Sequence, residues 1–137
     1  MGTLRSFQDA LITRVSQKIT CREYRGELSD LENIKMLGND LPLVLVDYVG
    51  DHYDGALKQY ARFNLYIVHL AYNEKKLKTN SLDLLDLCDE LDYLLSGESL
   101  DNSRPISLKS LQKMYDGKSG RAYLSAYVRT IEARLKK

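Results

Sequence analysis

Apolar residues recur at helical spacing in two segments of the chain. In residues 3–19 the apolar positions lie three or four residues apart, with polar positions between them: Leu4, Phe7, Leu11, Val15 and Ile19. In residues 80–96 the same spacing joins four apolar positions: Leu84, Cys88, Leu91 and Leu95. This periodicity predicts two amphipathic helices, each with one face directed toward a core. Thr3 is placed to cap the first of them.

Strand patterns occupy four further segments. Residues 41–49 form a short run of β-branched and aliphatic side chains, typical of a strand covered on both faces. Residues 60–72 alternate, and their predicted core face holds Ala61, Phe63, Leu65, Ile67, His69 and Ala71. Residues 104–115 and 121–132 flank the turn-rich stretch 116–120 and predict a hairpin. In its second strand we expect Ala122, Leu124, Ala126 and Val128 to face the core.

The remaining segments predict short elements and connections. A small strand is expected at 20–25, a short helix at 30–37, polar loops at 50–55 and 98–103, and a charged connection at 74–78. Because hairpin strands are antiparallel, the economical arrangement packs both helices on one face of the sheet. The sequence therefore predicts a single domain over residues 1–137 with an α+β fold, a largely antiparallel β-sheet packed by an N-terminal helix and a long central helix.

Charge and composition narrow the function classes. The chain has 20 basic and 19 acidic residues, so it lacks the overall basic excess of a sequence-independent nucleic-acid binder, although a local basic patch stays open. No apolar run approaches the roughly 18 residues that span a bilayer, and we expect no signal peptide at the N-terminus. Synthesis in a reducing cytoplasm is then expected, with Cys21 and Cys88 as buried free thiols.

Residues suited to catalysis are sparse. Asp51, His52 and Asp54 lie together in the predicted loop 50–55, where they favour either a solvated loop or the weak cation site of a small metal-dependent nuclease. The solvated loop is the interpretation we adopt, because nothing else in the segment completes a ligand set. We therefore predict no catalytic residue, no metal and no cofactor, and a protein that is not an enzyme.

Tyrosine dominates the aromatic residues, with 10 Tyr, 2 Phe and no Trp. A tyrosine ring packs while its hydroxyl stays hydrated, which suits either the outer face of a sheet or a protein interface. The candidate interface residues are those predicted to lie opposite the core face of their strands: Tyr60, Arg62, Tyr66, Tyr123 and Tyr127.

Three segments, in their order and spacing, resemble a family encoded in the tail-gene cluster of Mu-like contractile-tailed phages and prophages. The first is residues 7–14, Phe-Gln-Asp-Ala-Leu-Ile-Thr-Arg. The second is residues 24–28, followed by residues 41–46 and Gly50. The third is residues 63–68, followed by residues 81–86 and 95–97. The resemblance covers roughly residues 4–97, and the chain departs from the family at Asp47, in its Tyr-rich strands and over residues 98–137.

This family is similar to the tail-terminator group, whose members share an α+β fold. The resemblance implies a homohexameric ring at the head-proximal end of the virion tail, assembled in the cytoplasm of a bacterial host. Such a ring stops the addition of tube and sheath subunits and gives the head a docking surface. The implied partners are further copies of the chain, the tail tube and sheath proteins, and a head-completion or neck protein, with no membrane and no specific nucleic acid. A head–tail connector of the neck is the alternative within the structural class.

Overall fold

Two α-helices and five strands are formed in the computed structural model, which describes residues 3–29, 42–53, 55, 58–71, 74–119 and 122–135. At residues 70–71, 74–83, 102, 116–119 and 122–123 it describes the backbone alone. In chain order the elements are α1 (Leu4–Val15), β1 (Cys21–Glu23), the 3-10 turn η1 (Glu27–Ser29), β2 (Leu43–Tyr53), β3 (Gln59–Ala71), α3 (Glu74–Leu95), the 3-10 turn η3 (Leu100–Asn102), β4 (Ser107–Ser119) and β5 (Ala122–Leu135).

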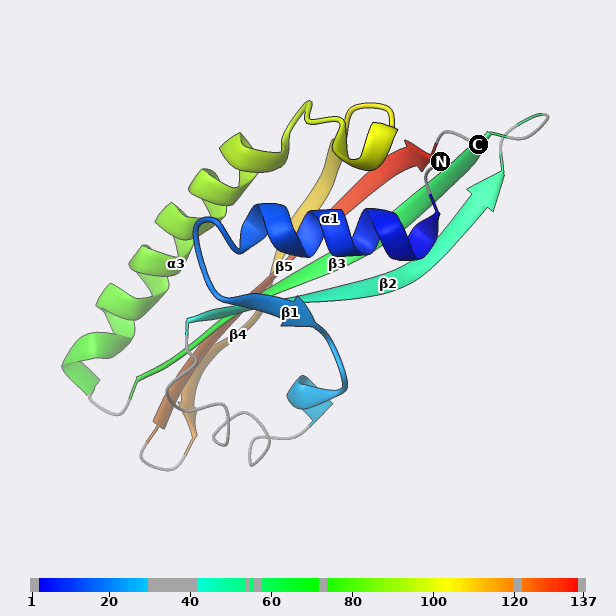
Figure 1. Ribbon diagram of the computed structural model, residues 1–137. Helices are drawn as coiled ribbons and strands as arrows, with labels where there is room; N and C mark the ends of the chain where they lie inside the picture. The colour runs from blue at the N-terminus through cyan, green and yellow to red at the C-terminus, as the bar shows by residue number, and fades with distance from the viewer. Residues whose placement is uncertain are drawn as a thin grey trace.

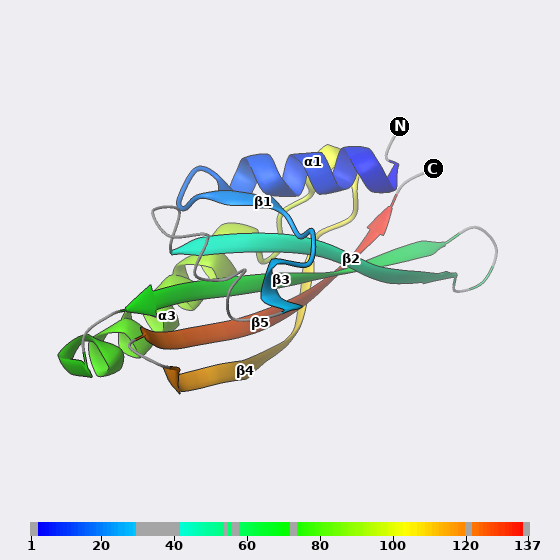
Figure 2. The same ribbon diagram turned by 90° about the horizontal axis from the view of Figure 1, so that it is seen from below.

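The five strands form one sheet in the order β1-β2-β3-β5-β4. β1 runs parallel to β2, and every other neighbouring pair is antiparallel. Figures 1 and 2 show α1 and α3 on the same side of this sheet, with α1 beside β1 and β2 and α3 nearer β5. The predicted α+β class, with its largely antiparallel sheet and two packing helices, is confirmed.

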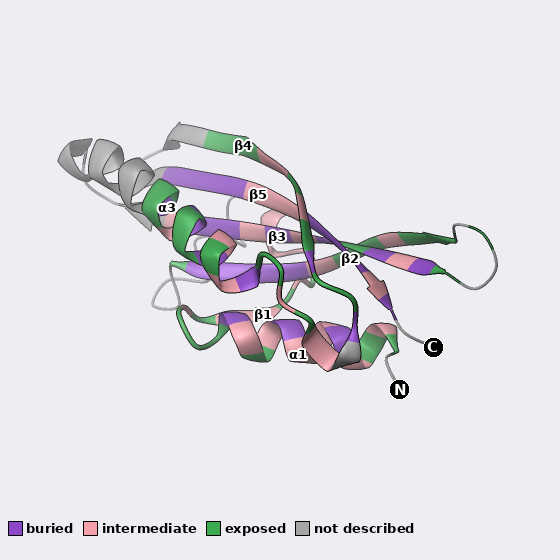
Figure 3. Ribbon diagram, turned by 90° about the horizontal axis from the view of Figure 1, so that it is seen from above, coloured by how far each residue is buried: buried purple, intermediate pink, exposed green. Residues whose placement is uncertain are grey.

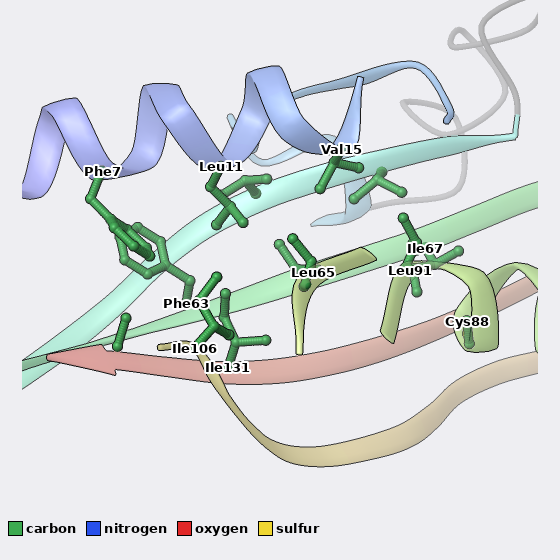
Figure 4. Packing of buried hydrophobic residues seen from close by; sticks show 14 of the residues in the cluster. Phe7, Leu11, Val15, Phe63, Leu65, Ile67, Cys88, Leu91, Ile106 and Ile131 are labelled. Atoms are coloured by element: carbon green, nitrogen blue, oxygen red, sulfur yellow. The ribbon is translucent and has the colours of Figure 1, made fainter. Parts of the chain in front are cut away.

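The main core lies between the two helices and the sheet (Figure 4). α1 contributes Phe7, Leu11 and Val15, α3 contributes Leu84, Cys88, Leu91 and Leu95, and β3 contributes Ala61, Phe63, Leu65 and Ile67. Phe7 and Phe63 pack against each other where the first turns of α1 meet the sheet, with ring centroids 5.4 Å apart. The helical and strand periodicities therefore predicted these faces correctly, because each face separates apolar from polar positions without ambiguity.

The start of α1 is held by two sets of side-chain contacts. Thr3 Oγ1 accepts a hydrogen bond from the Ser6 amide at 3.0 Å, and Ser6 Oγ accepts one from the Thr3 amide at 2.9 Å, which together form a capping box. Ser6 Oγ also donates to Asp101 Oδ2 at 2.5 Å. Asp101 has a φ of 50° in η3, so this contact joins the helix start to a loop about 95 residues further along the chain.

Several element boundaries differ from the predicted ones. The first helix, predicted over 3–19, ends at Val15, and β5 runs to Leu135 instead of residue 132. β2 continues through the predicted loop to Tyr53, because a register shift between Tyr48 and Gly50 lets the ladder with β3 resume. α3 begins at Glu74, six residues early, because the charged residues at 74–78 are good helix formers although they carry no apolar stripe. β4 extends to Ser119, which pairs with Ala122, so most of the predicted loop 116–120 is strand. The helix predicted at 30–37 lies outside the described residues.

The face assignment predicted for β5 is wrong. Tyr127 pairs with Ile67 of β3 and belongs to the main core, with 5% of its surface exposed. Leu124 and Ala126 instead pack with Val68 on the opposite face of the sheet. The alternation along β5 could not identify the core face, because this strand lies between two others and carries apolar residues on both sides.

Candidate functional site: the outer face of the sheet

The sheet face opposite α1 and α3, here called the outer face, changes character along its length. At one end five buried apolar residues pack with Tyr24, Leu28 and Tyr66: Leu43, Leu45, Val68, Leu124 and Ala126. At the other end the positions on β3 and β5 are polar or charged, and they are exposed or half-buried apart from Glu132 (Figure 3). This polar end places several of the predicted interface residues side by side.

Ion pairs and a hydrogen bond connect three strands across the polar end. Arg62 of β3 lies 3.0 Å from a carboxylate oxygen of Glu132 on β5, and Lys109 of β4 lies 3.9 Å from the other oxygen. Two residues further along each strand, on the same face, Thr130 Oγ1 of β5 donates a hydrogen bond to Asn64 Oδ1 of β3 at 2.8 Å. Half of the Arg62 side chain is exposed, so this pair contributes little to stability and instead fixes the position of charge on the surface.

Tyr60, Arg62 and Tyr66 share the outer face because they occupy alternate positions of β3. The Tyr60 ring stacks on His52 of β2, with centroids 5.2 Å apart and planes 10° from parallel. The Tyr66 ring packs against Tyr24, with centroids 5.0 Å apart. Burial raises the pKa of Asp47, and a hydrogen bond from Tyr66 opposes that rise. The three residues predicted on β3 therefore lie on one surface.

Neither of the two candidate residues on β5, Tyr123 and Tyr127, can be assigned to that surface. Tyr127 lies in the core on the helix-covered face, so the prediction that it lies opposite the core face of its strand is wrong. Tyr123 pairs with Ala71, and its side chain lies outside the described part of the chain. Three residues of the surface were missed: Lys109, Thr130 and Glu132. Only the strand register, with its shift between Leu108 and Ser110, brings them beside Arg62 and Asn64.

Asp51 and His52, two of the three residues weighed as a weak cation site, lie on β2 and not in the predicted solvated loop. The Asp51 carboxylate accepts hydrogen bonds from Tyr48 Oη at 2.6 Å and from Gln59 Nε2 at 2.5 Å. The first of these, aided by burial, raises the pKa of Tyr48 to about 12. His52 is the next residue of the strand and stacks on Tyr60, and Asp54 lies outside the described residues. Where the structure describes the chain, no group of three or more His, Cys, Asp or Glu could hold a metal ion.

Other features add no chemistry to the outer face. Both cysteines are free thiols, Cys88 buried and Cys21 half-buried, and burial raises their pKa values to about 11 and about 12. An open cavity of about 480 Å³ lies between α1, β1 and β2, lined by Leu4, Arg5, Gln8, Asp9, Glu23 and Tyr48. Within the described chain, no helix is long and apolar enough to cross a membrane.

Comparison with known proteins finds a solved structure with a similar fold but no protein with a similar sequence. No protein-family model and no curated protein matches this chain. Among solved structures, the chain is similar to a chain in "Virion of native gene transfer agent (GTA) particle", with a TM-score of 0.52 and 10% identity. The alignment covers 97% of this chain and 96% of that chain. At this identity the likeness shows that the two chains share a fold along nearly their whole length.

Proposed function

We propose that this chain is a structural protein of a phage-type virion, a tail terminator that forms a ring at the head-proximal end of the tail. The observation that carries the proposal is the fold shared, end to end, with a chain of a gene transfer agent virion. The segment resemblance to tail terminators of Mu-like phages supports the finer assignment. The role is structural and non-catalytic, and its partners are the tail tube and sheath proteins and a head-completion protein.

The surface of the chain suits assembly with other proteins. The outer face combines Tyr60 and Tyr66 with Arg62, and tyrosine and arginine are enriched at protein interfaces. With a net charge of +1, the chain carries little overall charge that would oppose contact between copies. A terminator needs one surface that accepts the tube end and another that cannot accept a further tube ring. The two unlike faces of a sheet covered by helices on one side supply such an asymmetry.

The decisive test combines solution mass with tail morphology. Light scattering across a concentration series, with and without the tail tube protein of the same gene cluster, should detect a ring of defined mass. Deleting the gene from a tail-producing strain should give abnormally long tails, because tube and sheath addition no longer stops. A monomer indifferent to tube protein, together with tails of normal length, would contradict the proposal. Tails of normal length that lack heads would assign the chain to the head–tail connector instead.

A further inference from the structure

The outer edge of β2 is covered by β1 over only a short stretch. β1 pairs with residues 44–46, and the last backbone hydrogen bond between the two strands runs from the Tyr24 amide to the Val46 carbonyl at 2.8 Å. The chain leaves the edge at this point, and the Tyr24 ring packs on Tyr66 of the outer face. β2 itself continues to Tyr53, and residues 48–53 are here called the β2 border. Within the described chain, no strand lies beside the β2 border on the β1 side.

The backbone of β2 directs hydrogen-bonding groups toward this edge. Val44 donates its amide to the Thr20 carbonyl at 2.9 Å, and Val46 accepts from Tyr24, so alternate residues of β2 turn their backbone groups to the β1 side. Tyr48 is the next residue in this alternation, and its backbone groups lie beyond the end of β1. Backbone groups at the edge of a sheet are a template for a further strand.

An open cavity lies beside the β2 border, between β2 and the first turns of α1. Its volume is about 480 Å³, within the range of roughly 300–1,000 Å³ that is typical of ligand pockets. Glu23, the last residue of β1, and Tyr48 line the cavity from the sheet, while Leu4 and Gln8 line it from the helix. Figure 1 shows β2 running on past the tip of β1 along the start of α1. The cavity is therefore placed to receive a side chain of a strand that continues the line of β1.

The cavity wall also carries an excess of carboxylates. Asp9 and Glu23 supply two carboxylates against the single guanidinium of Arg5. Glu23 lies 3.9 Å from Arg25, but both side chains are largely exposed, so this contact holds the carboxylate only weakly. A long side chain with an apolar stem and a cationic end therefore fits the cavity, because its stem can pack on the Tyr48 ring while its charge reaches the carboxylates.

Exposed apolar area follows the β2 border. Tyr48, Val49 and Tyr53 are 37%, 43% and 55% exposed, whereas residues 43–46 of the same strand are fully buried. The border contains no lysine and no proline, which are residues that commonly protect the edge of a sheet. The register shift between Tyr48 and Gly50 interrupts regular pairing, so a strand added here is short.

We propose that the β2 border binds an extended segment of a partner protein, which adds a short strand beside Tyr48 and places a lysine or arginine side chain in the cavity. An extended polypeptide is the occupant that fits, because its backbone can pair with an edge while its alternate side chains enter a pocket. A second copy is the poorer source, since the β4 edge of the sheet shifts register twice and carries lysines. This inference does not depend on the tail-terminator role, because it follows from the edge, the cavity and the exposed side chains.

A synthetic strand probe tests this edge in the full-length chain. The probe is a capped peptide of about eight residues, with valine and threonine alternating around a central arginine, long enough to span residues 48–53. It should bind saturably and slow the hydrogen exchange of the Tyr48 amide by about tenfold or more. Two control peptides carry N-methyl groups on alternate amides, one on each of the two alternating sets. Because only one set faces β2, one control should bind at least about tenfold more weakly and the other should bind like the probe.

Substitutions on α1 and in the probe test the cavity. Gln8→Trp fills the cavity and should weaken binding by about tenfold or more, which corresponds to about 1.4 kcal/mol. Thr13→Trp, at an exposed position of the same helix, is the matched control and should bind the probe like the wild type. A probe with glutamate in place of its arginine should also bind more weakly, because it brings a third carboxylate to Asp9 and Glu23. Circular dichroism and thermal unfolding verify that both variants fold.

The possible outcomes separate this inference from the virion role. A probe that does not bind, or that binds equally with either methylated control, would overturn the strand-binding edge even if the chain forms a ring. Binding indifferent to Gln8→Trp would overturn the placement of a side chain in the cavity. Protection of the Tyr48 amide that rises with protein concentration, without any probe, would identify a second copy as the occupant and overturn the assignment to a partner protein. A chain that binds the probe but forms no ring, even with tube protein, would overturn the terminator role alone.

Discussion

Arg129 on β5 forms an ion pair with Asp92 on α3, and this pair ties the long helix to the middle of the sheet. The Arg129 side chain is 12% exposed and that of Asp92 is 23% exposed, so the contact is mostly shielded from water. Arg129 is paired across the ladder with Leu65, which lies in the core, and its aliphatic stem runs along the core-facing side of the sheet. The pair therefore fixes where α3 lies on the sheet.

Replacing Arg129 with Met should destabilise the fold by leaving the Asp92 carboxylate shielded and without its cation. We expect a loss of about 1–3 kcal/mol in the free energy of unfolding, between the values for exposed and fully buried pairs. Urea denaturation of the monomer followed by circular dichroism measures it. The double variant Asp92→Leu/Arg129→Met should recover most of the loss. Arg62→Met, at a pair with a half-exposed arginine, serves as the control, and an equal effect at both sites would contradict this account.

Phe63 should be among the most sensitive core positions. Its side chain is fully buried, with ring centroids 5.4 Å from Phe7 and 5.5 Å from Tyr48, so it joins α1 to the sheet. Phe63→Ala should cost about 3–5 kcal/mol of unfolding free energy through lost burial and the cavity left behind. Tyr93→Ala is the matched control, because removing a side chain that is 91% exposed should change stability by less than about 0.5 kcal/mol. A comparable loss at both positions in urea denaturation would refute the packing argument.

Gly50 is required by backbone geometry at the point where β2 resumes its ladder. Its φ is 140°, and a Cβ built there would meet nothing within 4 Å, so the cost of a side chain is conformational and not steric crowding by neighbours. Gly50→Ala should destabilise the chain by about 1–3 kcal/mol. Gly97→Asn provides the comparison, because φ at Gly97 is 76°, in a region that Asn tolerates. Faster amide exchange in the β2–β3 hairpin of Gly50→Ala, with little change in Gly97→Asn, is the expected result.

The alternation along β3 was sufficient to predict a surface, whereas the alternation along β5 was not. In β3 the apolar positions Phe63 and Leu65 contrast with Arg62 and Asn64, so the core face of this part of the strand can be recognised from the sequence. In β5 both faces carry apolar residues, and the correct assignment depends on the pairing of Tyr127 with Ile67. Pairing is a long-range property that no local pattern contains.

The same limit applies to the candidate site. Tyr60, Arg62 and Tyr66 could be predicted because they share one strand. Their neighbours Lys109 and Glu132 could not, because two register shifts in the β4–β5 ladder decide which side chains meet across it. The position of β4 at the border of the sheet likewise depends on the tertiary arrangement, since no local pattern shows which strand ends the sheet.

The buried thiols should make stability fall at alkaline pH. Burial raises the pKa of Cys88 from 9.0 to about 11, and the Asp92 carboxylate adds to the rise while the Arg129 guanidinium opposes it. Burial alone raises the pKa of Cys21 to about 12. The unfolded chain therefore loses these protons near pH 9, while the folded chain keeps them. Because the unfolded state then binds fewer protons, the free energy of unfolding declines as pH rises from about 9 to 11.

Two measurements test this linkage and its cause. The pH dependence of unfolding should be shallower between pH 9 and 11 in Cys88→Ala, which lacks the titrating group, even though that variant is less stable at every pH. Alkylation of both thiols at pH 8.5 should be slow in the native protein and fast in urea, since the thiolate is the reactive form. Arg129→Met should speed the labelling of Cys88, because the thiol is 1% exposed and a smaller free energy of unfolding opens it to the reagent more often. Unchanged labelling in that variant would contradict the role of the Arg129–Asp92 pair in holding α3 on the sheet.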